Sequence, residues 1–220
     1  MRRSTAQLLL ALLLLLGGCS HAPPQLVQVF SQVNQVFDFP SARWTQRLSV
    51  FVQASSADGN RVFDRLHLIH DEQDLYITLN RDQWTVVERP GEYWVGTNSL
   101  TFPGKIPTGE WRALLVTRAG LKVESWFSIP APPPDAPSAR TLPVVVVSDG
   151  VANERYRVSG WVDNYLVWSW DAQGVLLGRA KTTGPVFAVP QGAVTFRLYS
   201  YDKGRGEGLE AGPFPVKGKD

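Results

Sequence analysis

The sequence predicts an all-β protein made of two tandem β-sandwiches. Three observations support this prediction. Short runs in which apolar and polar residues alternate recur through most of the chain. Turn signals rich in Gly, Pro, Asn and Asp separate these runs at a spacing of roughly ten residues. No convincing long amphipathic helix interrupts the pattern, and a proline-rich segment divides it into two halves.

The first half contains the clearest strand of the chain. In residues 47–54, Leu48, Val50 and Val52 alternate with polar or larger residues, as expected for a strand with one buried face. The turn that follows carries Asp58 and Gly59, a typical hairpin signal. The remaining expected strands of this half span residues 61–69, 75–79, 83–88, 93–95, 109–117 and 122–129, with a loop at 98–108.

Residues 26–39 fit two interpretations. Apolar residues spaced by three and four positions form a helical stripe, while the β-branched Val27 and Val29 suit a strand. We favour a strand with irregular ends.

The segment 131–140, APPPDAPSAR, is expected to be a linker. Consecutive prolines favour an extended spacer, which at about 3.1 Å per residue holds two domains up to about 30 Å apart. The expected domains are then 26–130 and 141–217. The alternative is a proline-rich loop within one larger sandwich.

The second half repeats the same layout without a residue-level repeat. Asp163 and Asn164 form a hairpin signal between two of its strands. Residues 203–212 are expected to form a Gly-rich, charged loop, followed by a short edge strand at 213–216. The other expected strands span residues 142–148, 155–161, 165–170, 175–180, 186–189 and 194–201.

Two stretches of the first half, LSVFVQASSADG and IPTGEWRALLVTRAG, resemble bacterial immunoglobulin-like or fibronectin-like domains. Those domains carry an alternating strand that ends in an Asp-Gly turn, and later a Pro-x-Gly-x-aromatic strand followed by an Ala-Gly hairpin. The resemblance implies two tandem immunoglobulin-like sandwiches, a fold that hosts many functions. The residues in the later positions are Pro107, Gly109, Trp111, Ala119 and Gly120.

The N-terminus reads as a cleaved signal peptide over residues 1–18. Arg2 and Arg3 precede a run of apolar residues at 8–16. That run is too short to span a bilayer, which needs about 20 apolar residues. An export signal is therefore favoured over a transmembrane helix.

The end of this signal, Leu16-Gly17-Gly18-Cys19, resembles the lipobox of bacterial lipoproteins. The resemblance implies cleavage between Gly18 and Cys19, a diacylglycerol on the Cys19 thiol, and an N-acyl chain of the palmitate type on the new amine. Two or more acyl chains anchor a protein stably, whereas one is marginal. Ser20 stands where some bacteria use Asp for inner-membrane retention, which favours the outer membrane.

Composition excludes several classes of function. The chain has 22 basic and 20 acidic residues. Cleavage removes Arg2 and Arg3, so the mature chain has a net charge of about zero. No basic run or basic half exists, so no nucleic-acid partner is expected. Cys19 is the only cysteine, so no disulfide is expected despite export. Residues 19–25 form the expected lipidated tether.

Eight tryptophans stand out in a chain of this length. Trp168 and Trp170 share one face of an expected strand, with Tyr165 on the other. We favour the interpretation that Leu166, Trp168 and Trp170 form the inward, core face; the alternative is an exposed platform for sugar rings. The candidate ligand-binding aromatic residues are Trp84, Trp94, Trp161, Trp168 and Trp170.

The sequence offers no strong metal or catalytic motif. His67 and His70 lie three apart in an expected strand and so point to opposite faces. The nearby Asp71, Glu72 and Asp74 lack the spacing of a calcium-binding loop, and a solvated acidic turn is favoured. No Gly-x-Ser-x-Gly motif is present. We therefore expect no catalytic residues, no metal, and no cofactor beyond the covalent lipid.

The expected function is that of a membrane-anchored lipoprotein of the bacterial envelope, acting by non-catalytic protein binding or in a structural role. The alternative is a carbohydrate- or peptidoglycan-binding lipoprotein that uses exposed tryptophans. An envelope enzyme with an unrecognised site is a third candidate. The expected location is the outer membrane, on its periplasmic or its external side, with partners among the membrane lipids and envelope proteins, or a glycan in the alternative.

Overall fold

The computed structural model describes residues 23–102, 104–131, 143–148, 155–159 and 164–216. Within these ranges the regular elements are fifteen β-strands and two single-turn 3-10 helices. The all-β class and the sandwich-like packing predicted from the sequence are confirmed. Neither helical turn in the described residues has the length and hydropathy required to cross a bilayer. The expected signal peptide, the cleavage position and Cys19 lie outside the described residues.

The strands of the first half are β1 (Gln25–Asp38), β2 (Arg43–Ser55), β3 (Phe63–His70), β4 (Leu75–Asn80), β5 (Thr85–Arg89), β6 (Glu92–Thr101), β7 (Gly109–Thr117) and β8 (Lys122–Ile129). The 3-10 turns η1 (Asn60–Val62) and η2 (Asp71–Gln73) flank β3. The second half contains β9 (Val144–Ser148), β10 (Arg155–Ser159), β11 (Tyr165–Trp170), β12 (Leu176–Thr182), β13 (Val186–Ala188), β14 (Thr195–Asp202) and β15 (Glu207–Pro215).

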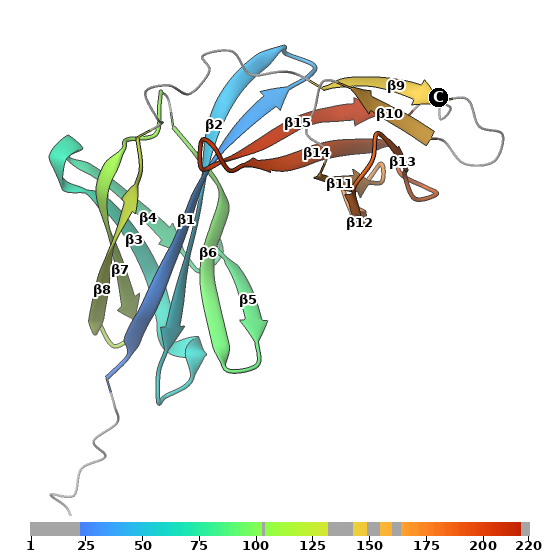
Figure 1. Ribbon diagram of the computed structural model, residues 1–220. Helices are drawn as coiled ribbons and strands as arrows, with labels where there is room; N and C mark the ends of the chain where they lie inside the picture. The colour runs from blue at the N-terminus through green and yellow to red at the C-terminus, as the bar shows by residue number, and fades with distance from the viewer. Residues whose placement is uncertain (1–22, 103, 132–142, 149–154, 160–163, 217–220) are drawn as a thin grey trace, which may run out of the picture.

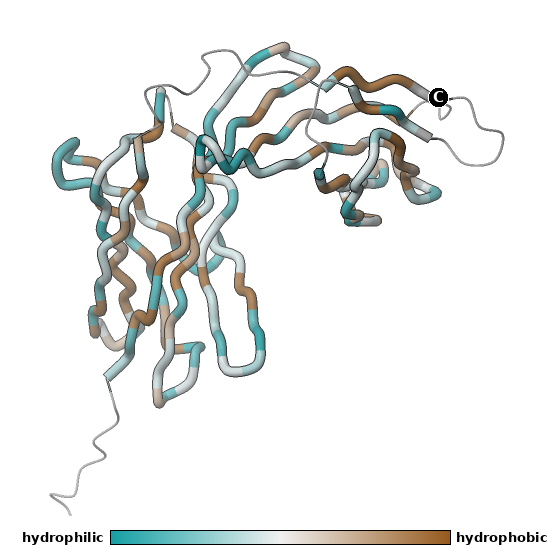
Figure 2. Tube along the Cα trace, viewed as in Figure 1, coloured by the Kyte–Doolittle hydropathy of each residue, from teal (hydrophilic) through white to brown (hydrophobic). Residues whose placement is uncertain are grey.

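One sheet runs through both halves of the molecule. Its eight strands follow the order β12-β11-β14-β15-β1-β2-β6-β5. A four-stranded sheet, β4-β3-β7-β8, packs against its first-half portion, and a three-stranded sheet, β13-β10-β9, belongs to its second-half portion. Figure 1 shows the two halves set at an angle, with the long β1–β2 hairpin running from one into the other. β9 is apolar along its length (Figure 2).

The β1–β2 hairpin is the element that joins the halves. Its pairing extends from Gln25 opposite Ser55 to Asp38 opposite Arg43, with one bulge between Leu26 and Gln28. The last residues of β1 also pair in parallel with β15, which comes from the far end of the sequence. Every other strand pair is antiparallel. The same hairpin therefore belongs to both sandwiches.

Each half has its own hydrophobic core. The first is centred on Trp111, Leu48 and Val50, all fully buried. The second contains Phe196 and Leu198 together with Phe37, and Trp44 packs against it. The domain ranges 26–130 and 141–217 stay a prediction. The structure adds a contact between the two halves that these ranges do not describe. Phe37 and Trp44, at the tip of the first hairpin, complete the core of the second half.

Residues 26–39 form a strand, as favoured from the sequence. Alternate residues of β1 face opposite ways: Val29 and Val33 pack against the first core, while Phe30 is exposed and Gln32 faces a groove. Buried and exposed side chains therefore alternate with a period of two and not the helical 3.6. The backbone hydrogen-bonding groups of β1 pair with β2 on one side and, from Asn34 to Asp38, with β15 on the other. The irregular end is a bulge between Leu26 and Gln28.

Two of the loop predictions were wrong. The loop expected from residue 98 begins inside β6, which continues to Thr101 along β2. The Gly-rich loop expected at 203–212 contains the start of β15, and β15 lies in the middle of the long sheet, not at an edge. Glycine weakens a strand unless another group approaches closely. At Gly208 a Cβ would lie 2.0 Å from the Asn34 side-chain oxygen, so a larger residue there would displace the Asn34 side chain.

Candidate ligand-binding groove

A groove lies on the face of the long sheet that points away from both cores. Its volume is about 450 Å³. Its lining residues come from β1, β2 and β6 of the first half and from β11, β12, β14 and β15 of the second. We call this site the groove; its lining residues are Phe30, Gln32, Asn34, Arg47, Ser49, Asn98, Trp168, Trp170, Leu176, Arg179, Tyr199 and Glu210.

The floor of the groove follows from the alternation of β1 and β2. Gln32 lies opposite Ser49, and Asn34 lies opposite Arg47. The intervening residues, such as Leu48, point into the first core. Since side chains alternate across a strand, the apolar face builds the core and the polar face builds the groove.

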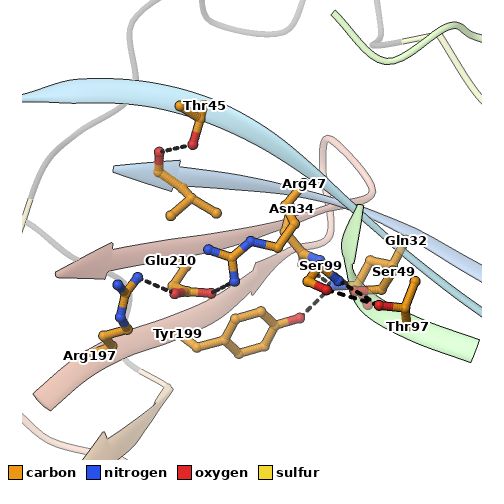
Figure 3. A network of polar contacts seen from close by, with 11 residues as sticks. Gln32, Asn34, Thr45, Arg47, Ser49, Thr97, Ser99, Arg197, Tyr199 and Glu210 are labelled. Atoms are coloured by element: carbon orange, nitrogen blue, oxygen red, sulfur yellow. Dashed lines mark hydrogen bonds and ion pairs between the residues drawn. The ribbon is translucent and has the colours of Figure 1, made fainter. Parts of the chain in front are cut away.

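Hydrogen bonds connect the polar groups of the floor (Figure 3). The Gln32 amide nitrogen donates to Asn34 Oδ1 at 2.7 Å and also to the hydroxyl of Tyr199 on β14. The Asn34 amide donates to Ser49 Oγ at 2.9 Å. Asn34 and Ser49 are buried. These contacts position the groove side chains and join the two halves at the bend.

Glu210 forms the charged end of the floor. Its carboxylate accepts from Arg197 Nη1 at 2.7 Å and is 3.5 Å from Arg47 Nη1. The Glu210 side chain is 6% exposed, whereas the two arginine side chains are 29% and 26% exposed. Two guanidinium groups therefore neutralise one buried carboxylate.

Aromatic rings form the wall of the groove on the second half. Trp168 stacks on Tyr199 with ring centroids 5.3 Å apart and an angle of 14°. Trp170 stands at 87° to Trp168, with centroids 6.4 Å apart. The Arg179 guanidinium lies 5.9 Å from the centre of the Trp168 ring. The tryptophans are thus not a flat pair of parallel rings.

The favoured interpretation of Trp168 and Trp170 as core residues was wrong. On β11 the buried face consists of Tyr165, Val167 and Ser169, and the two tryptophans lie half-buried on the opposite face. Both faces of this strand are rich in large apolar side chains, so its alternation did not identify the inward one. The core here is filled by neighbouring aromatic residues such as Phe187 and Phe196, which leaves room only for smaller side chains between them.

The phenol of Tyr199 is held neutral in the groove. Burial raises the pKa of Tyr199 above its ordinary value of 10.0, against a smaller lowering effect from the Gln32 hydrogen bond. The group therefore remains a hydroxyl across the physiological pH range, able to accept from Gln32 and to donate to a ligand oxygen.

The other candidate aromatic residues lie elsewhere. Trp84 packs against the first core. Trp94 is half-buried on β6 and donates from Nε1 to Glu92 at 3.0 Å. Neither lines the groove, and Trp161 lies outside the described residues.

His67 and His70 point to opposite faces of β3, as predicted. His67 Nδ1 lies 2.9 Å from Thr78 Oγ1, and burial lowers the pKa of His67. The fully buried His70 has Nε2 3.0 Å from the Thr108 carbonyl oxygen, which makes that nitrogen the donor. Asp71, in the acidic turn, pairs with Arg112 at 3.0 Å. In the described part of the chain, no group of three or more His, Cys, Asp and Glu is arranged to hold a metal ion.

Most groove residues were not singled out from the sequence. Gln32, Asn34, Arg47 and Glu210 occupy ordinary polar positions of alternating strands, and such positions usually indicate a solvated face. The pairing of β1 with β15 brings them together, and this parallel contact has no local sequence signal.

No protein-family model matches the chain, and a search of curated proteins gives no match. Among solved structures, the chain resembles dimeric latent PorU from Porphyromonas gingivalis, with 12% sequence identity and a TM-score of 0.31. The match covers 86% of this chain and 20% of the PorU chain. The chain thus spans about a fifth of PorU. It also resembles DIP-gamma IG1+IG2, with 10% sequence identity and a TM-score of 0.24. That match covers 86% of this chain and 96% of the DIP-gamma chain. These TM-scores are too low to support an argument on function.

Proposed function

We propose that this protein is a lipid-anchored lipoprotein of the bacterial envelope that binds an envelope component, without catalysis, in the groove. The observation that carries the proposal is the groove itself. It is a concave site whose floor and wall come from both halves of the chain, and half-buried aromatic rings lie beside convergent polar groups. Ligand sites in proteins have this composition.

The chemistry of the lining favours binding over catalysis. Its one carboxylate, Glu210, is already engaged in ion pairs with two guanidinium groups, those of Arg47 and Arg197. The remaining polar groups of the floor are amides and hydroxyls that hydrogen-bond to one another. Groups of this kind orient a ligand and do not take up protons at neutral pH.

The lipid anchor follows from the lipobox resemblance at Cys19. Gln25, at the start of β1, lies six positions after Cys19, and an extended chain reaches about 3.3–3.6 Å per residue. The first sandwich would then lie within roughly 20 Å of the bilayer. From Gln25 to Asn34, β1 rises a further 30 Å or so, at about 3.4 Å per residue. The groove would therefore be held clear of the lipid surface and open to other envelope components.

Photo-crosslinking in living cells tests the groove. A benzophenone amino acid replaces Asn98, which is exposed and lines the groove, or Tyr76, which is 58% exposed on β4 in another sheet. We expect the Asn98 position to give several times more adduct than the Tyr76 position, and W170A to reduce the Asn98 adduct. Equal yields from the two positions would overturn the binding role of the groove.

Fractionation tests the anchor separately. The wild-type chain is expected to take up labelled fatty acid and to sediment with membranes, and C19A to do neither. A C19A variant that still sediments with membranes, beside a wild type without label, would contradict the lipoprotein assignment.

A further inference from the structure

We propose that the groove binds a carboxylate-bearing glycan. This inference rests on the proposed binding function and names the ligand class for the same site. It follows from three features of the groove: the kind of polar group on its floor, the aromatic wall, and the balance of charge.

The floor is matched to ligand hydroxyl groups. Gln32, Asn34 and Asn98 carry side-chain amides, and Ser49 carries a hydroxyl. Each of these groups both donates and accepts hydrogen bonds. Adjacent hydroxyls on a sugar ring also do both, so they can join the existing Gln32–Asn34–Ser49 chain without leaving a polar group unpaired.

The wall provides apolar contact beside these polar groups. Trp170 is half-buried and stands perpendicular to Trp168, so the two rings form a corner and not a plane. Such a corner fits a ligand that has apolar C–H faces and polar edges, as a pyranose does. The Trp168 Nε1 atom is buried without an acceptor among the described residues.

The charges favour a ligand that carries a carboxylate. The charged residues that line the groove are Arg47, Arg179 and Glu210, and Glu210 is paired with Arg47 and with the neighbouring Arg197. No ion pair involves Arg179 in the described part of the chain, where its guanidinium lies over Trp168 at the edge of the groove. A planar guanidinium binds a carboxylate through two parallel hydrogen bonds, so Arg179 is the residue placed to pair with an acidic sugar.

The backbone argues against an extended peptide as the ligand. Peptides commonly bind by adding a strand to a free sheet edge. The floor of the groove lies on β1, β2, β14 and β15, which are interior strands of the eight-stranded sheet, and β15 pairs with β1 from Asn34 to Asp38. Most of their backbone groups are taken up by the sheet, so recognition in the floor depends mainly on side chains.

A matched pair of oligosaccharides tests the inference on the full mature chain in detergent. The probes are tetragalacturonate and its methyl ester, which differ only in the ligand carboxylates, and binding is measured by calorimetry. We expect the acid to bind more tightly than the ester. R179Q is expected to lower the affinity for the acid about tenfold and to leave that for the ester unchanged.

W170A is expected to weaken both ligands. R65Q and W126A change exposed residues on the other sheet and are expected to weaken neither. Equal affinity of acid and ester, or a loss of binding with R65Q as large as with R179Q, would overturn the inference. If neither probe binds while crosslinking from position 98 persists, the glycan assignment fails and the proposed binding function stands.

Discussion

The side-chain amide of Gln32 on β1 donates a hydrogen bond to the phenol oxygen of Tyr199 on β14, a residue 167 positions further along the chain. The contact is part of the polar network drawn in Figure 3 and joins a strand of the first half to a strand of the second. It lies beside the parallel pairing of β1 with β15, which makes the first strand of the protein part of both halves. The groove depends on this arrangement, because its floor comes from the same strands.

Loss of the Gln32 side-chain amide should weaken the junction. In Q32L, Asn34 Oδ1 and the Tyr199 hydroxyl both lose their donor. Leaving a largely buried polar group unpaired costs about 1–3 kcal/mol, so the free energy of unfolding should fall by that amount in urea titrations. The control is Q28L, on the same face of β1 but exposed, which should change stability by less than about 0.5 kcal/mol. Equal effects of the two variants would contradict the role of the network.

Neutralising Glu210 should destabilise the fold. E210Q leaves Arg47 and Arg197 without their shared carboxylate. Hydrogen bonds to charged groups contribute about 1.5–3 kcal/mol, and the partial exposure of the arginines favours the lower part of that range. E124Q removes the exposed partner of Arg112 and should cost less than about 1 kcal/mol. Thermal unfolding of both variants measures the difference, and a neutral E210Q would count against this explanation.

Truncation at the tip of the first hairpin should destabilise the second sandwich. Phe37 is 7% exposed and packs in the second core, where its ring lies 5.3 Å from that of Trp44. Truncating a buried Phe or Trp side chain to Ala typically lowers the free energy of unfolding by about 3–5 kcal/mol. Hydrogen exchange of F37A should therefore show faster exchange along β14 and β15 than in the wild type. Acceleration confined to the first sandwich would contradict the shared hairpin.

Acid should reduce stability through His67. Its pKa is lowered in the folded state by burial, helped by Arg65 and Lys122, whereas the unfolded chain has the ordinary value of 6.5. The unfolded state therefore binds more protons between the folded and unfolded pKa values. This contribution to stability is fully present above about pH 6.5 and is lost as the pH falls through the folded pKa. Urea midpoints measured from about pH 8 to pH 5 should decline less in H67Q than in the wild type; parallel declines would exclude His67 as the cause.

Much of the fold was predictable because its signals are local. The strand at 47–54 and its Asp-Gly turn were recognised from alternation alone, and β2 continues that strand to both sides. The start of β15 was missed because Gly208 and Gly212 are poor strand formers when considered without their neighbours. In the sheet, Gly208 is needed for the close approach of Asn34.

The groove was harder to predict than the fold. Trp168 and Trp170 were recognised as candidates, but their side of β11 was assigned wrongly because the larger apolar side chains lie on the outward face and the buried face includes Ser169. Their partner Tyr199 comes from β14, and Arg179 from the edge strand β12. Contacts of this kind depend on strand order, which the local pattern of apolar residues does not determine.

Hydrogen exchange on the full mature chain, with and without tetragalacturonate, tests most directly the claim that both halves form one binding site. We predict slower exchange in β2 and β6 of the first half together with β11 and β12 of the second half, and no change in β4 or β8. Protection confined to one half, or located on the β4-β3-β7-β8 sheet, would contradict it.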